Sequence, residues 1–82
     1  MKQKLPQNIA DSVIKSLAHL RKSSGLSHEK VAQMSTLNRS TISLIEAGKR
    51  DPSLVTLLKI SQALDCSLGQ LIVQAEKENR KN

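Results

Sequence analysis

The stretch "LNRSTISLIEAGKR", residues 37–50, decides how this chain is interpreted. At about 100° per residue, Ile42 and Ile45 share one side of a helix. The opposite side carries small or uncharged residues, namely Ser40, Ser43, Leu44 and Ala47. An ordinary solvent-facing helix would carry lysines and glutamates there. Short side chains without acidic groups suit a helix that enters the major groove of DNA, because they can approach base edges and are not repelled by phosphates.

Length and composition limit the possible folds. A chain of 82 residues with 38% hydrophobic residues forms one small domain. Folding at this size buries only about 60 to 65% of the surface that the unfolded chain exposes, so a partner subunit would add stability. The chain has no Phe, Tyr or Trp. This argues against proteins that stack single-stranded bases on aromatic side chains.

The charge balance is basic. Thirteen Lys and Arg against seven Asp and Glu give a formal net charge of +6. This charge suits a polyanion such as nucleic acid or an anionic membrane surface, although a merely soluble basic protein has the same composition. No run approaches the roughly 18 apolar residues of a membrane span, and no signal-peptide pattern is present, so we expect a cytoplasmic protein.

Catalytic and metal-binding motifs are missing from the sequence. Its single cysteine and two histidines have no metal-ligand spacing. It contains no Walker loop and no His/Cys/Asp cluster. We therefore expect no enzymatic activity, no metal and no cofactor.

The apolar periodicity predicts an all-α fold of five helices with no strand. The predicted helices cover about 8–24, 27–34, 38–47, 53–64 and 67–77. They form one domain over 8–75, between an N-terminal tail at 1–7 and a charged C-terminal tail at 76–82. Asn8, with Asp11 three residues on, is expected to cap the first helix. Further N-caps are expected at Ser27, Asn38 and Ser53, and glycine C-caps at Gly25 and Gly48.

Two longer stretches carry a family resemblance. "LRKSSGLSHEKVAQ" (20–33) and "NRSTISLIEAGKRDPSLVTLLKISQAL" (38–64) resemble the helix-turn-helix domain of the lambda repressor and Cro family, also called Xre-type. The shared elements are L-R, G-L-S, a V/L-A pair, S-T-I-S-x-I-E-x-G and P-S, at fixed spacings over residues 9 to 73. The resemblance implies a compact five-helix domain that regulates transcription by binding specific double-stranded DNA.

Within this family the chain looks most similar to the small controller proteins of restriction-modification systems. Single-domain repressors and antitoxins share much of the pattern. Promoter occlusion and positioning of RNA polymerase both fit such a regulator, which makes polymerase a possible further partner. The alternative function is an antitoxin-type or adaptor protein whose main role is to bind a protein partner. A short polar tail after Ala75 argues against that alternative, because such proteins often carry a toxin-wrapping segment.

The resemblance also implies roles for single residues. Base-reading positions of the family fall on Asn38, Arg39, Ser40 and Leu44. Arg39 can pair bidentately with O6 and N7 of guanine, which is worth about 1 to 3 kcal/mol of discrimination. Leu44 can contact a thymine methyl group, or it is simply an exposed leucine.

Other positions are expected to serve phosphate binding or structure. The expected phosphate contacts are Ser27, His28, Thr41, Ser43, Lys49 and Arg50. The family commonly has glutamine where this chain has His28, which allows a pH-dependent contact here. By the same resemblance, Arg21 and Glu46 form an ion pair that ties the first helix to the recognition helix. Thr36 replaces the usual turn glycine, so either the turn changes or Thr36 is strained.

Two-fold geometry predicts a homodimer. One recognition helix reads only a few base pairs, whereas a dimer reads half-sites about 34 Å apart. The fifth predicted helix has more apolar surface than the core needs, at Leu68, Leu71, Ile72, Val73 and Ala75. We expect part of this surface, Val73 above all, to meet a second copy on a pseudo-palindromic operator. The alternative is that all of it covers the core of the monomer.

Overall fold

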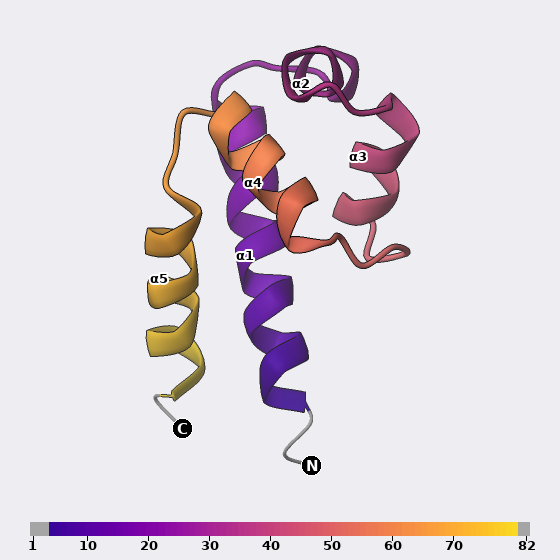
Figure 1. Cartoon of the computed structure of the whole chain (residues 1–82). Coiled ribbons are helices and arrows are strands. Elements are labelled where there is room, and N and C mark those ends of the chain that lie inside the picture. The colour runs from indigo at the N-terminus through magenta and orange to yellow at the C-terminus, as the bar shows by residue number, and fades with distance from the viewer. Residues whose placement is uncertain (1–3, 81–82) are drawn as a thin grey trace.

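The computed structural model describes residues 4–80, and within them the chain forms five helices and no strand (Figure 1). The helices are α1 (Lys4–Ser23), α2 (His28–Ser35), α3 (Arg39–Glu46), α4 (Leu54–Ala63) and α5 (Leu68–Arg80). The predicted all-α fold is confirmed. Over this part of the chain, no helix is long and apolar enough to cross a membrane.

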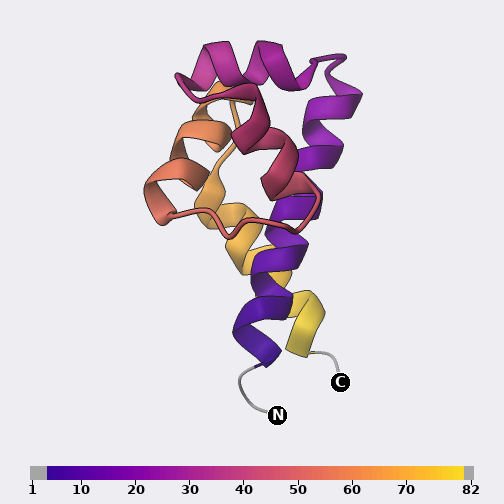
Figure 2. The ribbon, with the colours of Figure 1, turned by 90° about the vertical axis from the view of Figure 1, so that its right-hand side faces the viewer.

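The helix α1 is the axis on which the other helices pack. It has 20 residues, which corresponds to about 30 Å at 1.5 Å per residue, and the molecule measures 37 × 22 × 20 Å. Helix α5 runs antiparallel beside it, so the start of α1 and the end of α5 lie at the same end of the molecule (Figures 1 and 2). Helices α2, α3 and α4 gather around the other end of α1. The helix-turn-helix pair is therefore held away from the chain ends.

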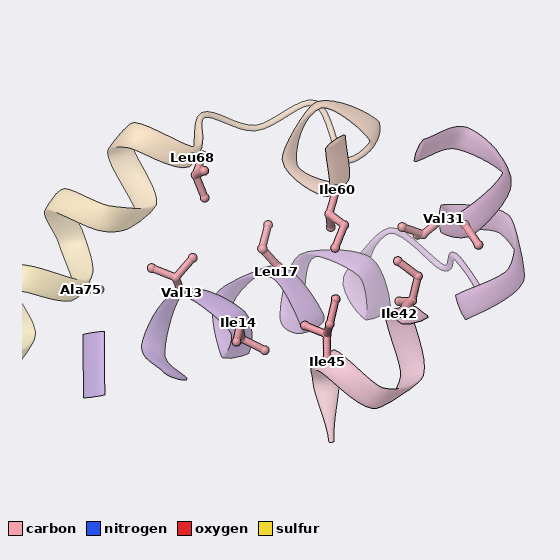
Figure 3. Close-up of a cluster of buried hydrophobic side chains, with 10 residues drawn as sticks. Val13, Ile14, Leu17, Val31, Ile42, Ile45, Ile60, Leu68 and Ala75 are labelled. Atoms are coloured by element: carbon pink, nitrogen blue, oxygen red, sulfur yellow. The ribbon is translucent and has the colours of Figure 1, made fainter. Parts of the chain in front are cut away.

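All five helices contribute side chains to the core (Figure 3). The buried hydrophobic residues are Val13, Ile14, Leu17, Val31, Ala32, Ile42, Ile45, Ile60, Leu68 and Ala75. Ile42 and Ile45 are each only 2% exposed, as their spacing predicted. Burying two isoleucines holds α3 in one rotation about its axis and leaves the opposite side at the surface.

Caps set most of the helix boundaries. The Ser27 hydroxyl accepts a hydrogen bond from a backbone N–H of α2 at 3.0 Å, and Ser53 does the same for α4 at 3.1 Å. Asn38 occupies the N-cap position of α3, but its side chain makes no capping hydrogen bond. Gly25 and Gly48 follow α1 and α3 with φ of 71° and 74°. These left-handed conformations suit glycine and end each helix.

The predicted start of the first helix at Asn8 is wrong. Helix α1 begins at Lys4 and continues through Pro6, which is tolerated because the first turn of a helix needs no backbone donor. Gln7 Nε2 donates to Asp11 Oδ1 at 3.0 Å, so Asp11 bonds along the helix and does not complete the expected capping box. The predicted N-terminal tail is thus helical from Lys4, and its residues 1–3 lie outside the described residues.

The predicted end of the fifth helix near residue 77 is also too early. Helix α5 continues to Arg80, through most of the expected charged tail, whose residues 81–82 lie outside the described residues. Asn79 Nδ2 donates to Ser12 Oγ of α1 at 3.2 Å and to Ala75 O at 2.8 Å. A side chain held by both helices keeps the last turn of α5 on α1.

Of the two alternatives at Thr36, a changed turn or a strained backbone, the structure has the strained backbone. It adopts φ 58° and ψ 38° at the end of α2, the left-handed conformation that the usual glycine would adopt without cost. The N–H of Leu37 donates to Ala32 O at 2.8 Å, which closes the helix end in the ordinary way. The turn is therefore left-handed at Thr36, and this β-branched residue bears a cost of about 1 to 2 kcal/mol.

Replacing Thr36 by glycine should stabilise the protein. We expect Thr36→Gly to raise the free energy of unfolding by about 1 kcal/mol, because the strain removed exceeds the added chain entropy of glycine. Urea unfolding followed by circular dichroism measures the change. Asp65→Gly is the matched control, since Asp65 is left-handed with φ 55° but aspartate tolerates this conformation better. A loss of stability in Thr36→Gly would contradict the expected strain.

Candidate nucleic-acid interface

The outer side of α3 is free of acidic side chains. Arg39, Ser40, Ser43 and Ala47 are exposed, and Leu44 is half-buried. In Figure 2 α3 lies toward the viewer, with α2 above it and the loop that follows α3 below it. The structure therefore brings the expected base-reading residues onto one accessible surface, with Leu44 less accessible than its position in the sequence suggested.

The start of α3 presents two polar side chains together. Asn38 is exposed in an extended backbone conformation, and its amide is not used as a helix cap. Arg39 is the first residue of the helix and is also exposed. An amide and a guanidinium at one helix start offer hydrogen-bond donors in two geometries, and the amide oxygen adds an acceptor.

The start of α2 holds Ser27 and His28. The Ser27 oxygen accepts the capping hydrogen bond from Lys30 N–H, which leaves its hydroxyl hydrogen free to donate to an anion. His28 is half-buried, and its Nε2 lies 3.0 Å from Glu46 Oε1. The sequence did not predict this contact. His28 is therefore held inside the molecule by one ring nitrogen while part of the ring reaches the surface.

Arg21 and Glu46 form a bidentate ion pair between α1 and α3. Arg21 Nε lies 2.7 Å from Glu46 Oε2, and Nη2 donates to Oε1 at 3.0 Å. Arg21 Nη1 also donates to the carbonyl of Leu26 at 2.8 Å, in the segment that leads to α2. With His28, these contacts join α1, α2 and α3 at a single carboxylate.

The surroundings of Glu46 keep it ionised. Burial alone would raise the pKa of Glu46, but hydrogen bonds from Arg21 and His28 outweigh it, and the pKa lies below its ordinary value of 4.5. The bond to Glu46 likewise raises the pKa of Arg21 despite the opposing effect of burial. Glu46 is thus held as a carboxylate in a stable ion pair with Arg21.

The loop after α3 adds two basic residues. Lys49 and Arg50 are both exposed. Arg50 Nη1 donates to the Thr41 hydroxyl at 3.3 Å, which connects the loop to the middle of α3. The expected phosphate contacts thus lie on both sides of the exposed face of α3, at the start of α2 and in this loop.

The predicted dimer surface on α5 is partly wrong. Leu68 and Ala75 are 5% and 2% exposed and belong to the core of the monomer. Leu71 and Ile72 are half-buried against that core. Val73 is 50% exposed. The reason is that α5 lies along α1 and must bury one stripe there, so only residues off that stripe remain available to a partner.

A second exposed apolar group lies on α4 and was not predicted from the sequence. Leu54, Val55 and Leu58 of α4 are 63%, 61% and 40% exposed, and we refer to these three residues as the α4 patch. The segment "LVTLLKI", 54–60, has five apolar residues in seven. One face of a helix cannot bury that many, and this excess was the available signal.

Comparisons with known proteins agree with this geometry. A family model described as helix-turn-helix matches residues 17–71. The control protein C.MunI of a Mycoplasma species is 46% identical over 63 residues, which are 76% of this chain and 85% of that protein. The uncharacterized HTH-type transcriptional regulator y4dJ of Sinorhizobium fredii is 33% identical over 60 residues, 73% of this chain and 78% of that protein.

A solved structure is similar as well. The restriction-modification controller protein C.AhdI from Aeromonas hydrophila superposes with a TM-score of 0.70 at 37% sequence identity. The match covers 79% of this chain and 97% of that chain. The likeness therefore includes the helix-turn-helix and most of the helices that support it.

The ion pair at Glu46 predicts loss of stability in acid. Because folding lowers its pKa, this carboxylate stabilises the protein fully above pH 4.5, and the contribution is lost as the pH falls through the lowered value. Glu46→Gln should cost about 1 to 2 kcal/mol at neutral pH, because it leaves Arg21 without a charged partner. The free energy of unfolding of Glu46→Gln should also fall less than that of the native protein between about pH 7 and pH 3.

Urea unfolding at a series of pH values measures both effects. Glu78→Gln is the control, since Glu78 is exposed and should leave the pH dependence of the native protein unchanged. Parallel pH profiles for Glu46→Gln and the native protein would show that another group controls acid unfolding.

Proposed function

This chain belongs to the helix-turn-helix family of DNA-binding transcriptional regulators, and from this premise we propose that it binds a pseudo-palindromic DNA operator as a homodimer. The exposed, non-acidic face of α3 carries the proposal. Two buried isoleucines hold that face outward, and the pair of Arg21 and Glu46 ties α3 to α1. A recognition helix needs this combination of a rigid support and a face that can approach bases.

Base reading is assigned to the first turns of α3. Arg39 pairs with a guanine, because its guanidinium fits O6 and N7 together. Asn38 and Ser40 hydrogen-bond base edges or nearby phosphates, and the unused amide of Asn38 supports that role. Leu44 contacts a thymine methyl group, which its half-buried position allows only if the helix enters the groove deeply.

Phosphate contacts flank the recognition helix. Lys49 and Arg50 neutralise phosphates beyond the end of α3, and the hydroxyls of Thr41 and Ser43 add neutral donors. Ser27 and His28 meet the backbone on the other side, where the N–H groups and positive end of the α2 dipole favour an anion. Contacts on both sides set the register of the helix in the groove without reading sequence.

The homodimer is proposed to form through Val73 and the α4 patch. These four residues are the large hydrophobic side chains of α4 and α5 that stay exposed, and α4 contacts α5. A second copy is the occupant because the reading of two half-sites needs a symmetric pair. Packing of this apolar surface against the same surface of a second copy would also add buried area to a small core.

We propose a controller-like role in transcription. The likeness to C.MunI and C.AhdI, which are named as a control protein and a restriction-modification controller, supports it. Contact with RNA polymerase stays a prediction, as does a cytoplasmic location in a bacterial or phage-infected cell. No catalytic activity is part of the proposal.

Selection from a random duplex DNA pool at physiological salt tests operator binding. We expect enrichment of a palindrome whose half-sites lie about one helical turn apart. Arg39→Ala should relax the preference at one guanine per half-site, which corresponds to about 1 to 3 kcal/mol of lost discrimination. Arg80→Ala, at the far end of α5, is the control and should retain the full motif. Enrichment of no motif would refute the operator and favour a protein partner.

Disruption of the apolar surface tests the dimer. We expect the native protein to sediment as a dimer at micromolar concentration, and Leu54→Lys combined with Val73→Lys to sediment as a folded monomer, because a buried unpaired charge opposes association. Leu5→Lys is the control, since Leu5 is 42% exposed near the start of α1. A native protein that is monomeric, or a double variant that remains dimeric, would contradict this surface.

A further inference from the structure

His28 occupies a position between a buried anion and the surface. Its Nε2 lies 3.0 Å from Glu46 Oε1, and the side chain is 34% exposed. Glu46 accepts hydrogen bonds from Arg21 as well. The imidazole is thus tied to the support of the recognition helix by one nitrogen, and it is not enclosed.

The chemistry of this contact determines the protonation of one ring nitrogen. The carboxylate of Glu46 is ionised and has no proton to donate, so it acts only as an acceptor. Nε2 must therefore carry the hydrogen. In the neutral ring Nδ1 then has no hydrogen, and its lone pair repels a phosphate oxygen. In the protonated ring Nδ1 carries a second N–H, which attracts a phosphate oxygen.

We propose that His28 binds a DNA phosphate only as the imidazolium, donating from Nε2 to Glu46 and from Nδ1 to the phosphate, so that DNA binding takes up a proton. This inference rests on the proposed function, because it needs a phosphate at the start of α2. A glutamine at this position has no titrating group, so the pH dependence belongs to histidine.

Charged groups on three helices surround the ring. They are Glu46 of α3, Arg21 of α1, and the neighbours Glu29 and Lys30 on α2 itself. Lys59 of α4 lies at the other end of α2, beside Met34 and Thr36. In the free protein the attraction of Glu46 is shared with Arg21. A phosphate adds a second anion on the opposite side of the ring, and the protonated form then satisfies both.

The coupling has a defined direction. Because the complex holds one more proton than the separate molecules, affinity rises as the pH falls, by up to about tenfold per pH unit for one proton. The dependence ends where the ring of the free protein is itself protonated. Affinity should therefore increase as the pH falls from about pH 8, and it should level off once the ring of the free protein is protonated.

The test compares the pH dependence of affinity for the native protein and for His28→Gln. The probe is the duplex enriched from the random pool, with affinity measured by fluorescence anisotropy at constant ionic strength. Glutamine can still donate to Glu46 or to a phosphate but cannot gain a proton. We expect it to remove most of the increase. His19→Gln is the matched control, because His19 lies on α1 beside α5 and should keep the native slope.

A second measurement does not depend on the variant. Nitrogen chemical shifts of the His28 ring distinguish its two neutral tautomers from the imidazolium. We expect hydrogen on Nε2 in the free protein at about pH 8, and hydrogen on both nitrogens in the complex at about pH 7. A neutral ring in the complex, or hydrogen on Nδ1 alone in the free protein, would overturn the inference.

The outcomes separate this inference from the proposed function. Equal slopes for the native protein and His28→Gln, with the same duplex still bound, would overturn the proton uptake and leave the operator binding intact. Failure to enrich or bind any duplex would remove both. A purely structural role of His28 would change the melting temperature of the variant but not the slope of affinity against pH.

Discussion

The orientation of α3, the proposed recognition helix, depends on the carboxylate of Glu46. Helix α3 has only eight residues, too few to be stable alone in water, so its orientation must come from tertiary contacts. Buried Ile42 and Ile45 fix the rotation of α3 about its own axis. The bidentate ion pair of Glu46 with Arg21 ties α3 to the 20-residue helix α1. His28 brings the start of α2 to the same carboxylate. One anion thus connects α2 and α3, which carry most of the proposed DNA surface, to α1.

The turn between α2 and α3 shows how strongly this arrangement is held. Thr36 remains left-handed although another conformation would relieve it. The reason is that helices α2 and α3 are each packed into the core, through Val31 and Ile42 among others. The combined burial of both helices outweighs a local cost of about 1 to 2 kcal/mol. The left-handed conformation at this turn is therefore maintained by the packing and does not require glycine.

The excess apolar residues of α5 are mostly buried in the monomer, whereas those of α4 stay exposed. Along α5, Leu68 and Ala75 are buried where α5 packs on α1. Most of the apolar surface that the sequence assigned to a dimer therefore belongs to the core of the monomer. On α4, the crowded apolar segment leaves Leu54 and Val55 more exposed than any other large hydrophobic residue described. The proposed partner surface therefore shifts toward α4. Which excess residues a small helical protein buries depends on the helix that lies next to them.

Sequence alone determined the five helices, the inward side of α3 and the identity of the helix-turn-helix, because periodicity, caps and fixed spacings act within a few residues of each other. It also led to the partnership of Arg21 and Glu46 through the family pattern. The contact of His28 with Glu46, the choice between the two alternatives at Thr36, and which of the excess apolar residues of α4 stay exposed required the tertiary structure. Each of these depends on how helices distant in sequence pack against one another, and no local pattern encodes that distance. The extension of α5 was missed for the same reason, since Asn79 reaches across to Ser12.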